Sequence, residues 1–154
     1  MAIFLTVCGC QRYSSVNLKT WAEQVKESTV YDVNMIDLKH NYTNDLTGVF
    51  AAPFKLSTFK ECLPSAKFIK KDMNGALKWK GGSLVVVTFH DGTTKQLAIS
   101  YYGNFFVVIG QKGYYSFGEK GNLEWAKEYN GILFDDFIPK RRKRNAEQEN
   151  QRTP

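Results

Sequence analysis

The stretch SLVVVTFHDGTTKQLAISYYGNFFVVIGQKGYYSF, residues 83–117, decides the fold that we expect for this chain of 154 residues. Runs of β-branched and aromatic residues are separated there by short breaks that contain glycine, at residues 90–92, 102–104 and 110–113. Such breaks are typical of hairpin turns, because glycine readily adopts the positive φ angles that tight turns require. Together with residues 77–80 before it, the stretch predicts an antiparallel meander of four or five strands.

Two segments upstream of the meander have the spacing of amphipathic helices. In residues 18–25, which follow the potential N-cap Asn17, apolar side chains recur at i, i+3, i+4 and i+7. A second helix is expected to begin near Thr58, which precedes Glu61 at capping-box spacing. Pro64 either kinks this helix or lies in its first turn. The expected fold class is therefore α+β, with one or two N-terminal helices packed on the antiparallel meander.

Shorter patterns predict the remaining elements of one domain. Residues 31–35 alternate between apolar and polar side chains and predict a half-buried strand, and residues 132–138 predict a last strand. With 43% hydrophobic and 14% aromatic residues, the chain has enough apolar surface for a single folded core. We expect this domain to span residues 17–139.

The net charge of +6 lies mostly in the C-terminal segment. Residues 140–154 contain six of the 21 basic residues but only two of the 15 acidic ones. Ala146 is the only apolar residue of this segment, which composition predicts to be a disordered basic tail. The rest of the chain is nearly balanced in charge, so a nucleic-acid partner is not expected.

The first eleven residues, MAIFLTVCGCQ, form an apolar run that ends in Val7-Cys8-Gly9-Cys10. This ending resembles the lipobox of bacterial lipoprotein signals. The resemblance implies that residues 1–16 are a signal and spacer, that Cys10 is lipidated, and that the lipid anchors the protein to the membrane of the bacterial cell envelope. The alternative is that residues 3–7 form a buried first strand of a cytoplasmic protein and that both cysteines are reduced core residues.

Few side chains form a pattern that supports catalysis or metal binding. His90 and Asp91 lie together at a predicted turn, where an Asp-Gly pair is explained by the turn itself, so a hydrolase that uses His90 is the least favoured function. Cys62 lies in an apolar pattern, which favours packing in the core. The sequence contains neither Cys/His spacing for a metal nor a glycine-rich phosphate loop. We therefore expect no catalytic residues, no metal and no cofactor.

Consecutive aromatic residues mark three of the predicted strands or their ends. Neighbouring residues of a strand face opposite sides of the sheet, so one member of each pair faces away from the core unless a helix covers the second face as well. Outward tyrosines offer a large, rigid contact area to a partner. The candidate partner-binding residues are Tyr101, Tyr102, Tyr114 and Tyr115.

These patterns favour a small exported lipoprotein that acts as a non-enzymatic binding module. Its partner would be an unknown protein or a cell-wall polymer, and a lipid would hold it at the membrane. The alternative is a soluble interaction protein, such as a toxin-neutralising or regulatory module, whose first strand is residues 3–7.

Overall fold

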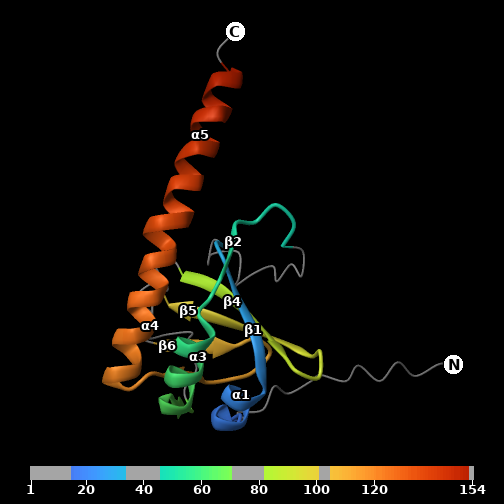
Figure 1. Cartoon of the computed structure of the whole chain (residues 1–154), viewed down its shortest axis with the longest axis vertical. Coiled ribbons are helices and arrows are strands. Elements are labelled where there is room, and N and C mark those ends of the chain that lie inside the picture. The colour runs from blue at the N-terminus through green and yellow to red at the C-terminus, as the bar shows by residue number, and fades with distance from the viewer. Residues whose placement is uncertain (1–14, 34–45, 71–81, 101–104, 153–154) are drawn as a thin grey trace, which may run out of the picture.

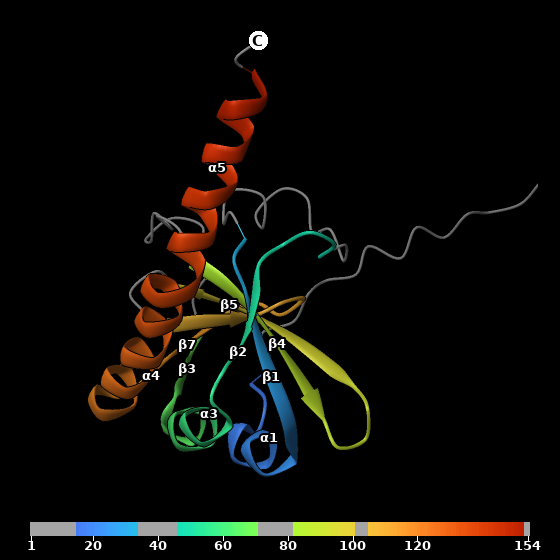
Figure 2. The same ribbon diagram turned by 45° about the horizontal axis from the view of Figure 1, so that its top comes forward.

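A computed structural model describes residues 15–33, 46–70, 82–100 and 105–152. In this part of the chain, helices pack on one face of a seven-stranded antiparallel sheet (Figures 1 and 2). The strands are β1 (Val25–Tyr31), β2 (Ala51–Pro53), β3 (Lys67–Ile69), β4 (Gly82–Phe89), β5 (Thr94–Ser100), β6 (Phe105–Val108) and β7 (Tyr114–Ser116). The helical elements are α1 (Leu18–Gln24), α3 (Leu56–Cys62), the 3₁₀ turn η1 (Leu63–Ser65), α4 (Glu119–Ile132), the π-helical segment η2 (Leu133–Phe137) and α5 (Ile138–Arg152).

The α+β class is confirmed, and the meander predicted over residues 83–117 is present as β4 to β7; residues 77–80, predicted as part of it, lie outside the described part. Strands β4, β5, β6 and β7 are neighbours in chain order, within the sheet order β2-β1-β4-β5-β6-β7-β3. Gly92 and Gly110, in two of the predicted turns, both have a φ of +82°. The sheet has more strands than predicted, because β1, β2 and β3 extend it on both sides through pairings between distant parts of the chain.

The first helix begins where the sequence predicts and ends one residue early. The Asn17 side chain caps α1 by accepting a hydrogen bond from the Thr20 N–H at 3.2 Å. Val25, predicted to belong to the helix, instead begins β1. The strand predicted over residues 31–35 is therefore displaced to 25–31, where β-branched residues pair with both β2 and β4; residues 34–35 lie outside the described part.

The second predicted helix corresponds to α3, but its capping box is absent. The N-cap is Lys55, which makes no side-chain cap hydrogen bond, and Thr58 lies inside the helix. Pro64 stands at the start of the 3₁₀ turn η1 rather than kinking a longer helix. Since proline lacks an N–H and has a fixed φ, it fits the first turn of a helix at little cost.

The strand predicted over residues 132–138 is wrong, because this segment is helical. Trp125, Tyr129, Leu133 and Phe137 follow one another at intervals of four residues and are all buried. A regular α-helix would turn such a row away by about 40° at each step. The wider π-helical turn of η2 offsets part of this rotation and keeps the row against the sheet.

The segment predicted to be a disordered tail forms α5, which continues the helix as far as Arg152 and projects beyond the sheet (Figure 1). Its first turns contact the body of the protein. The Arg141 guanidinium pairs through two nitrogen atoms with the carboxylate of Asp32, whose side chain is only 5% exposed. Lys140 pairs with Asp136 at 2.7 Å. Composition alone predicted disorder here because these ion pairs and the preceding helix are not local properties of the tail.

The pair of Arg141 and Asp32 gives the first prediction. Replacing Arg141 by alanine leaves a nearly buried carboxylate without its donor, so the free energy of unfolding should fall by about 1–3 kcal/mol. The matched control is Arg142→Ala, because Arg142 is exposed and makes no hydrogen bond or ion pair with the described residues; a change of less than about 0.5 kcal/mol is expected there. Urea unfolding followed by circular dichroism measures both values. Equal effects would show that Arg141 does not hold α5 to the body.

Candidate functional site

Two of the four predicted partner-binding tyrosines lie in the described part of the chain. Tyr101 and Tyr102 lie outside it. Tyr115 is 2% exposed, and its ring stacks on that of Phe106 with centroids 4.9 Å apart. Tyr115 is therefore a core residue on the face that the helices cover, and its ring is not available to a partner.

The hydroxyl of Tyr115 also has a structural role. It accepts a hydrogen bond at 2.7 Å from the backbone N–H of Val16, the residue before the N-cap of α1. Burial raises the pKa of this hydroxyl, and the hydrogen bond from Val16 offsets part of the effect. Tyr115 thus fixes the start of α1 to strand β7.

Tyr114 lies on the opposite, outer face of the sheet. It is half-buried, and its ring meets that of Phe105 edge-on, with centroids 6.0 Å apart and an interplanar angle of 65°. Val107, also half-buried, lies on the same face as Phe105 because the two are alternate residues of β6. Helices α1, α3 and α4 contribute to the core on the other face (Figure 2). We call Phe105, Val107 and Tyr114 the outer aromatic surface.

His90 and Asp91 are turn residues. The Asp91 carboxylate accepts hydrogen bonds from the Thr93 N–H at 2.9 Å and from the Thr93 hydroxyl at 2.7 Å, which lowers its pKa. His90 is exposed at the end of β4. The Asp91 carboxylate therefore stabilises the turn of its own hairpin, as the turn interpretation of this pair predicts.

Cys62 packs in the core, as predicted. It is 1% exposed, at the end of α3 next to α4. Burial raises the pKa of the thiol from 9.0 to about 11, and the carboxylates of Glu124 and Glu61 add to this, against a hydrogen bond with the Trp125 backbone. A thiol that remains protonated and buried is a poor nucleophile.

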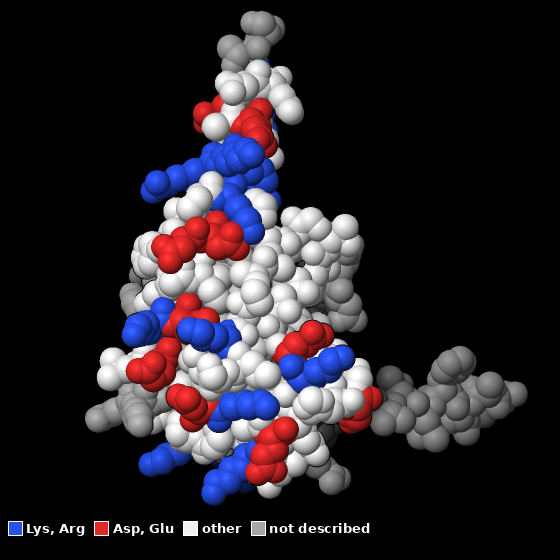
Figure 3. All heavy atoms as spheres, in the orientation of Figure 1, with Lys and Arg blue, Asp and Glu red and all other residues white. Residues whose placement is uncertain are grey.

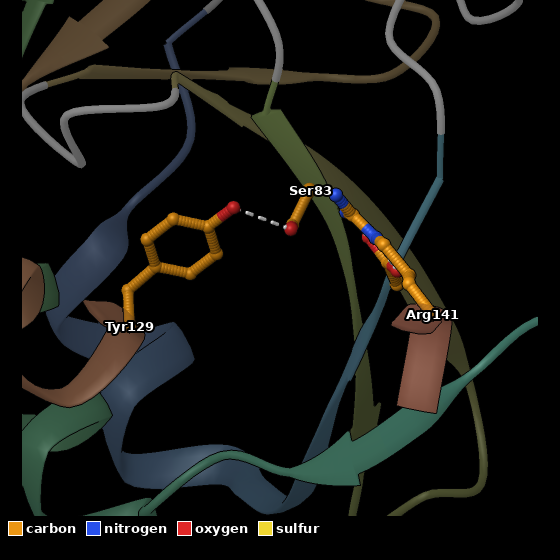
Figure 4. A network of polar contacts seen from close by, with 4 residues as sticks. Ser83, Tyr129 and Arg141 are labelled. Atoms are coloured by element: carbon orange, nitrogen blue, oxygen red, sulfur yellow. Dashed lines mark hydrogen bonds and ion pairs between the residues drawn. The ribbon is translucent and has the colours of Figure 1, made fainter. Parts of the chain in front are cut away.

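Polar contacts hold the long C-terminal helix against the start of the sheet. Figure 4 shows Tyr129 pointing from α4 toward Ser83 at the start of β4, with Arg141 nearby. The Tyr129 and Ser83 hydroxyls are hydrogen-bonded at 2.7 Å in a buried position. About three turns further along the helix, Arg141 pairs with Asp32, the residue just after β1. Both contacts are structural, and they fix the direction of the helix.

The basic residues of α5 form a block that stands out from the mixed charges of the body (Figure 3). Three of the five consecutive cations at 140–144 contact the body. Arg141 pairs with Asp32, while Lys140 and Arg144 lie 6.0 and 4.8 Å from the centroid of the Phe50 ring. Most of these basic side chains therefore attach α5 to the body of the protein.

An open groove of about 700 Å³ separates strand β2 from the helix formed by α4 and η2. Ala51, Ala52 and Pro53 form one wall, and helix residues from Glu124 to Lys140 form the other. Among the described residues, no group of three histidine, cysteine or carboxylate side chains could hold a metal ion. No described helix has both the length and the apolarity that crossing a membrane requires.

The sequence did not predict this groove, because no strand was expected at residues 51–53 and a strand, not a helix, was expected at residues 132–138. One local signal was present: Glu124, Glu128, Gly131 and Asp135 follow one another at steps of four, three and four, which places them on one face of a helix.

The environment of Cys62 gives the second prediction. Iodoacetamide at about pH 8 should label Cys62 at least about a hundredfold more slowly in the folded protein than in guanidinium chloride, as peptide mass spectrometry would measure site by site.

Because the pKa of the Cys62 thiol is raised in the folded state, the stability that this thiol contributes is present below pH 9 and is lost as the pH rises toward 11. Cys62→Ala should therefore lose stability less steeply over that range. Rapid labelling of folded Cys62 would contradict its buried position.

Comparison of the chain with protein-family models, with curated proteins and with solved structures finds no match.

Proposed function

We propose that this protein is a non-enzymatic binding module of the bacterial cell envelope, anchored through a lipid on Cys10. Its partner is a protein or a cell-wall polymer, bound by the outer aromatic surface. The observation that carries this proposal is the placement of Tyr114 and Phe105 on the sheet face opposite the described helices.

The proposal of binding, rather than catalysis, rests on how the reactive side chains are used. Cys62 is buried with a raised pKa, and Asp91 is engaged in its own turn. Tyr129 and Ser83 bond to one another inside the core. Each of these groups has a structural partner, which supports a role for the protein in recognition.

The outer aromatic surface has the properties of a contact patch. Phe105 and Tyr114 belong to β6 and β7, which are paired strands, so their positions are fixed by the sheet. Tyrosine has few rotatable bonds and therefore loses little conformational entropy when a partner covers it. A rigid aromatic pair of this kind is typical of the residues that dominate binding energy.

The alternative function, a soluble toxin-neutralising or regulatory module, uses the same surface. It differs at the N-terminus, where residues 3–7 would form a strand in place of a signal. The fate of Cys10 therefore distinguishes the two.

The third prediction concerns this anchor. Expressed in bacteria, the protein should enter the membrane fraction, and Cys10→Ser should release it or stall its processing, because the attached lipid supplies the membrane affinity. Fractionation with immunoblotting measures this, and Cys62→Ser is the matched control, which should not change the distribution. A soluble native protein that retains Met1 in its mass spectrum would favour the alternative.

The fourth prediction concerns the outer aromatic surface. Tyr114→Ala should change the free energy of unfolding by about 1 kcal/mol or less but weaken partner binding by roughly 1–2 kcal/mol or more. Tyr115→Ala should instead cost about 3 kcal/mol of stability, since it truncates a core aromatic. Thermal unfolding measures the stability of both variants.

Binding is measured in cells with a photoreactive phenylalanine analogue at position 114 and, as a control, at the exposed hairpin residue Thr93. A discrete crosslinked product is expected from position 114 alone. Equal crosslinking from both positions, or none from position 114, would contradict this placement of the binding surface.

A further inference from the structure

Strand β2 is an edge of the described sheet, and the open groove runs directly beside it. We propose that this groove binds a short, extended, basic peptide segment of a partner protein, which adds to the sheet as a further strand next to β2. This mode combines backbone hydrogen bonds to a free edge with side-chain contacts to a neighbouring wall. The site is separate from the outer aromatic surface and does not depend on it.

The register of β2 shows which backbone groups face the groove. The Asp32 N–H donates to the Phe50 carbonyl, and the Phe54 N–H donates to the Ser28 carbonyl, both at 2.9 Å. Hydrogen-bonding groups alternate in direction along a strand, so Phe50, Ala52 and Phe54 direct theirs toward β1. The N–H and carbonyl of Ala51 and the carbonyl of Pro53 are therefore turned to the free edge.

These groups suit a short ligand. A residue opposite Ala51 would both donate to and accept from its backbone, and the next outward group, the Pro53 carbonyl, adds one acceptor. Proline has no N–H to offer, and its presence limits how far pairing can extend along an edge. The edge is therefore able to take up a few residues, whereas a long intermolecular sheet would lack a donor at Pro53.

The helix side of the groove carries the negative charge that would attract a basic peptide. Glu124, Glu128 and Asp135 line the groove, and none of these three carboxylates makes a hydrogen bond or ion pair with the described residues. The fourth carboxylate of the groove, that of Asp136, is already paired with Lys140. The carboxylates without a partner outnumber the two remaining lysines, Lys55 and Lys127.

The spacing of the carboxylates fits alternate side chains of a strand. Glu128 and Asp135 are seven residues apart on the helix, about 10 Å along its axis. Alternate residues of a strand are about 6.7 Å apart, so two long basic side chains reach both carboxylates. Between them a Cβ placed on Gly131 would meet no atom within 4 Å, which leaves room for the ligand.

The ends of the groove define the length of the ligand. Lys55 and Thr58 lie at one end, and Lys140, which also approaches the Phe50 ring, lies at the other. The helix between Glu124 and Lys140 is about 24 Å long, the length of about seven extended residues. A segment of five to seven residues therefore fills the site.

The test uses the full chain and a fluorescein-labelled peptide, Thr-Lys-Val-Lys-Thr, whose central valine is placed opposite Ala51. Binding is followed by fluorescence anisotropy at about 50 mM salt, and a dissociation constant in the range of tens of micromolar is expected. The peptide with glutamate in place of both lysines should bind at least about tenfold more weakly. The lysine peptide methylated at its central amide nitrogen should also lose about tenfold, because it cannot donate to Ala51.

Variants of the protein test the two walls separately. Ala51→Pro removes the outward N–H and should weaken binding about tenfold, whereas Ala51→Val keeps this donor and should not. Glu128→Gln combined with Asp135→Asn should weaken binding about tenfold at low salt and by less than about twofold near 1 M salt. Glu23→Gln combined with Glu27→Gln, on exposed residues away from the groove, is the matched control and should have no effect.

Three results would overturn the proposal. One is equal binding of the lysine and glutamate peptides, or no binding at millimolar concentration. A second is unchanged affinity for both Ala51→Pro and the methylated peptide; if Ala51→Pro does not fold, the methylated peptide decides this on the unaltered protein. The third is a dimer in sedimentation experiments that Ala51→Pro dissociates, which would assign the edge to a second copy of the chain.

Discussion

The packing of the Trp125 indole is the contact on which the arrangement of helices and sheet depends. This ring is fully buried and meets three phenylalanine rings, with centroids 4.5 Å from Phe54, 5.6 Å from Phe59 and 4.8 Å from Phe117. Phe54 follows the edge strand β2, Phe117 follows β7 near the other edge, and Phe59 belongs to α3. One side chain therefore joins both sides of the sheet to two helices, and truncating such a residue typically costs about 3–5 kcal/mol.

The direction of the helix from Trp125 onward decides where the polar contacts fall. The buried row continues through Tyr129, whose hydroxyl meets Ser83 in the core. Beyond the π-helical segment, Arg141 reaches the Asp32 carboxylate. Since breaking a buried polar pair costs far more than the pair contributes, these contacts penalise other orientations of the helix. The same orientation leaves the next face of the helix, with its carboxylates, turned toward β2.

The features that the sequence predicted are those encoded locally. The meander follows from alternation and glycine turns within residues 83–117, and the cap at Asn17 follows from its spacing to Thr20. The pairing of β1 with β4 and of β3 with β7 joins distant segments and has no local signal. The apolar run at 132–138 is too short for its sequence to distinguish a strand from a helix. It is helical because Leu133 and Phe137 continue the buried row of the helix that contains Trp125. Likewise, alternation predicts that one of Tyr114 and Tyr115 faces outward. The stacking of Phe106 on Tyr115 makes Tyr115 the inward residue and Tyr114 the outward one.

The two edges of the described sheet are β2 and β3, which are both strands of only three residues. At the β2 edge, protection is limited to the short length of the strand and the missing N–H of Pro53. An edge that was only to be blocked would be covered by the nearby helix. Here an open groove separates the helix from β2, and the carboxylates of Glu124, Glu128 and Asp135 line its helix side.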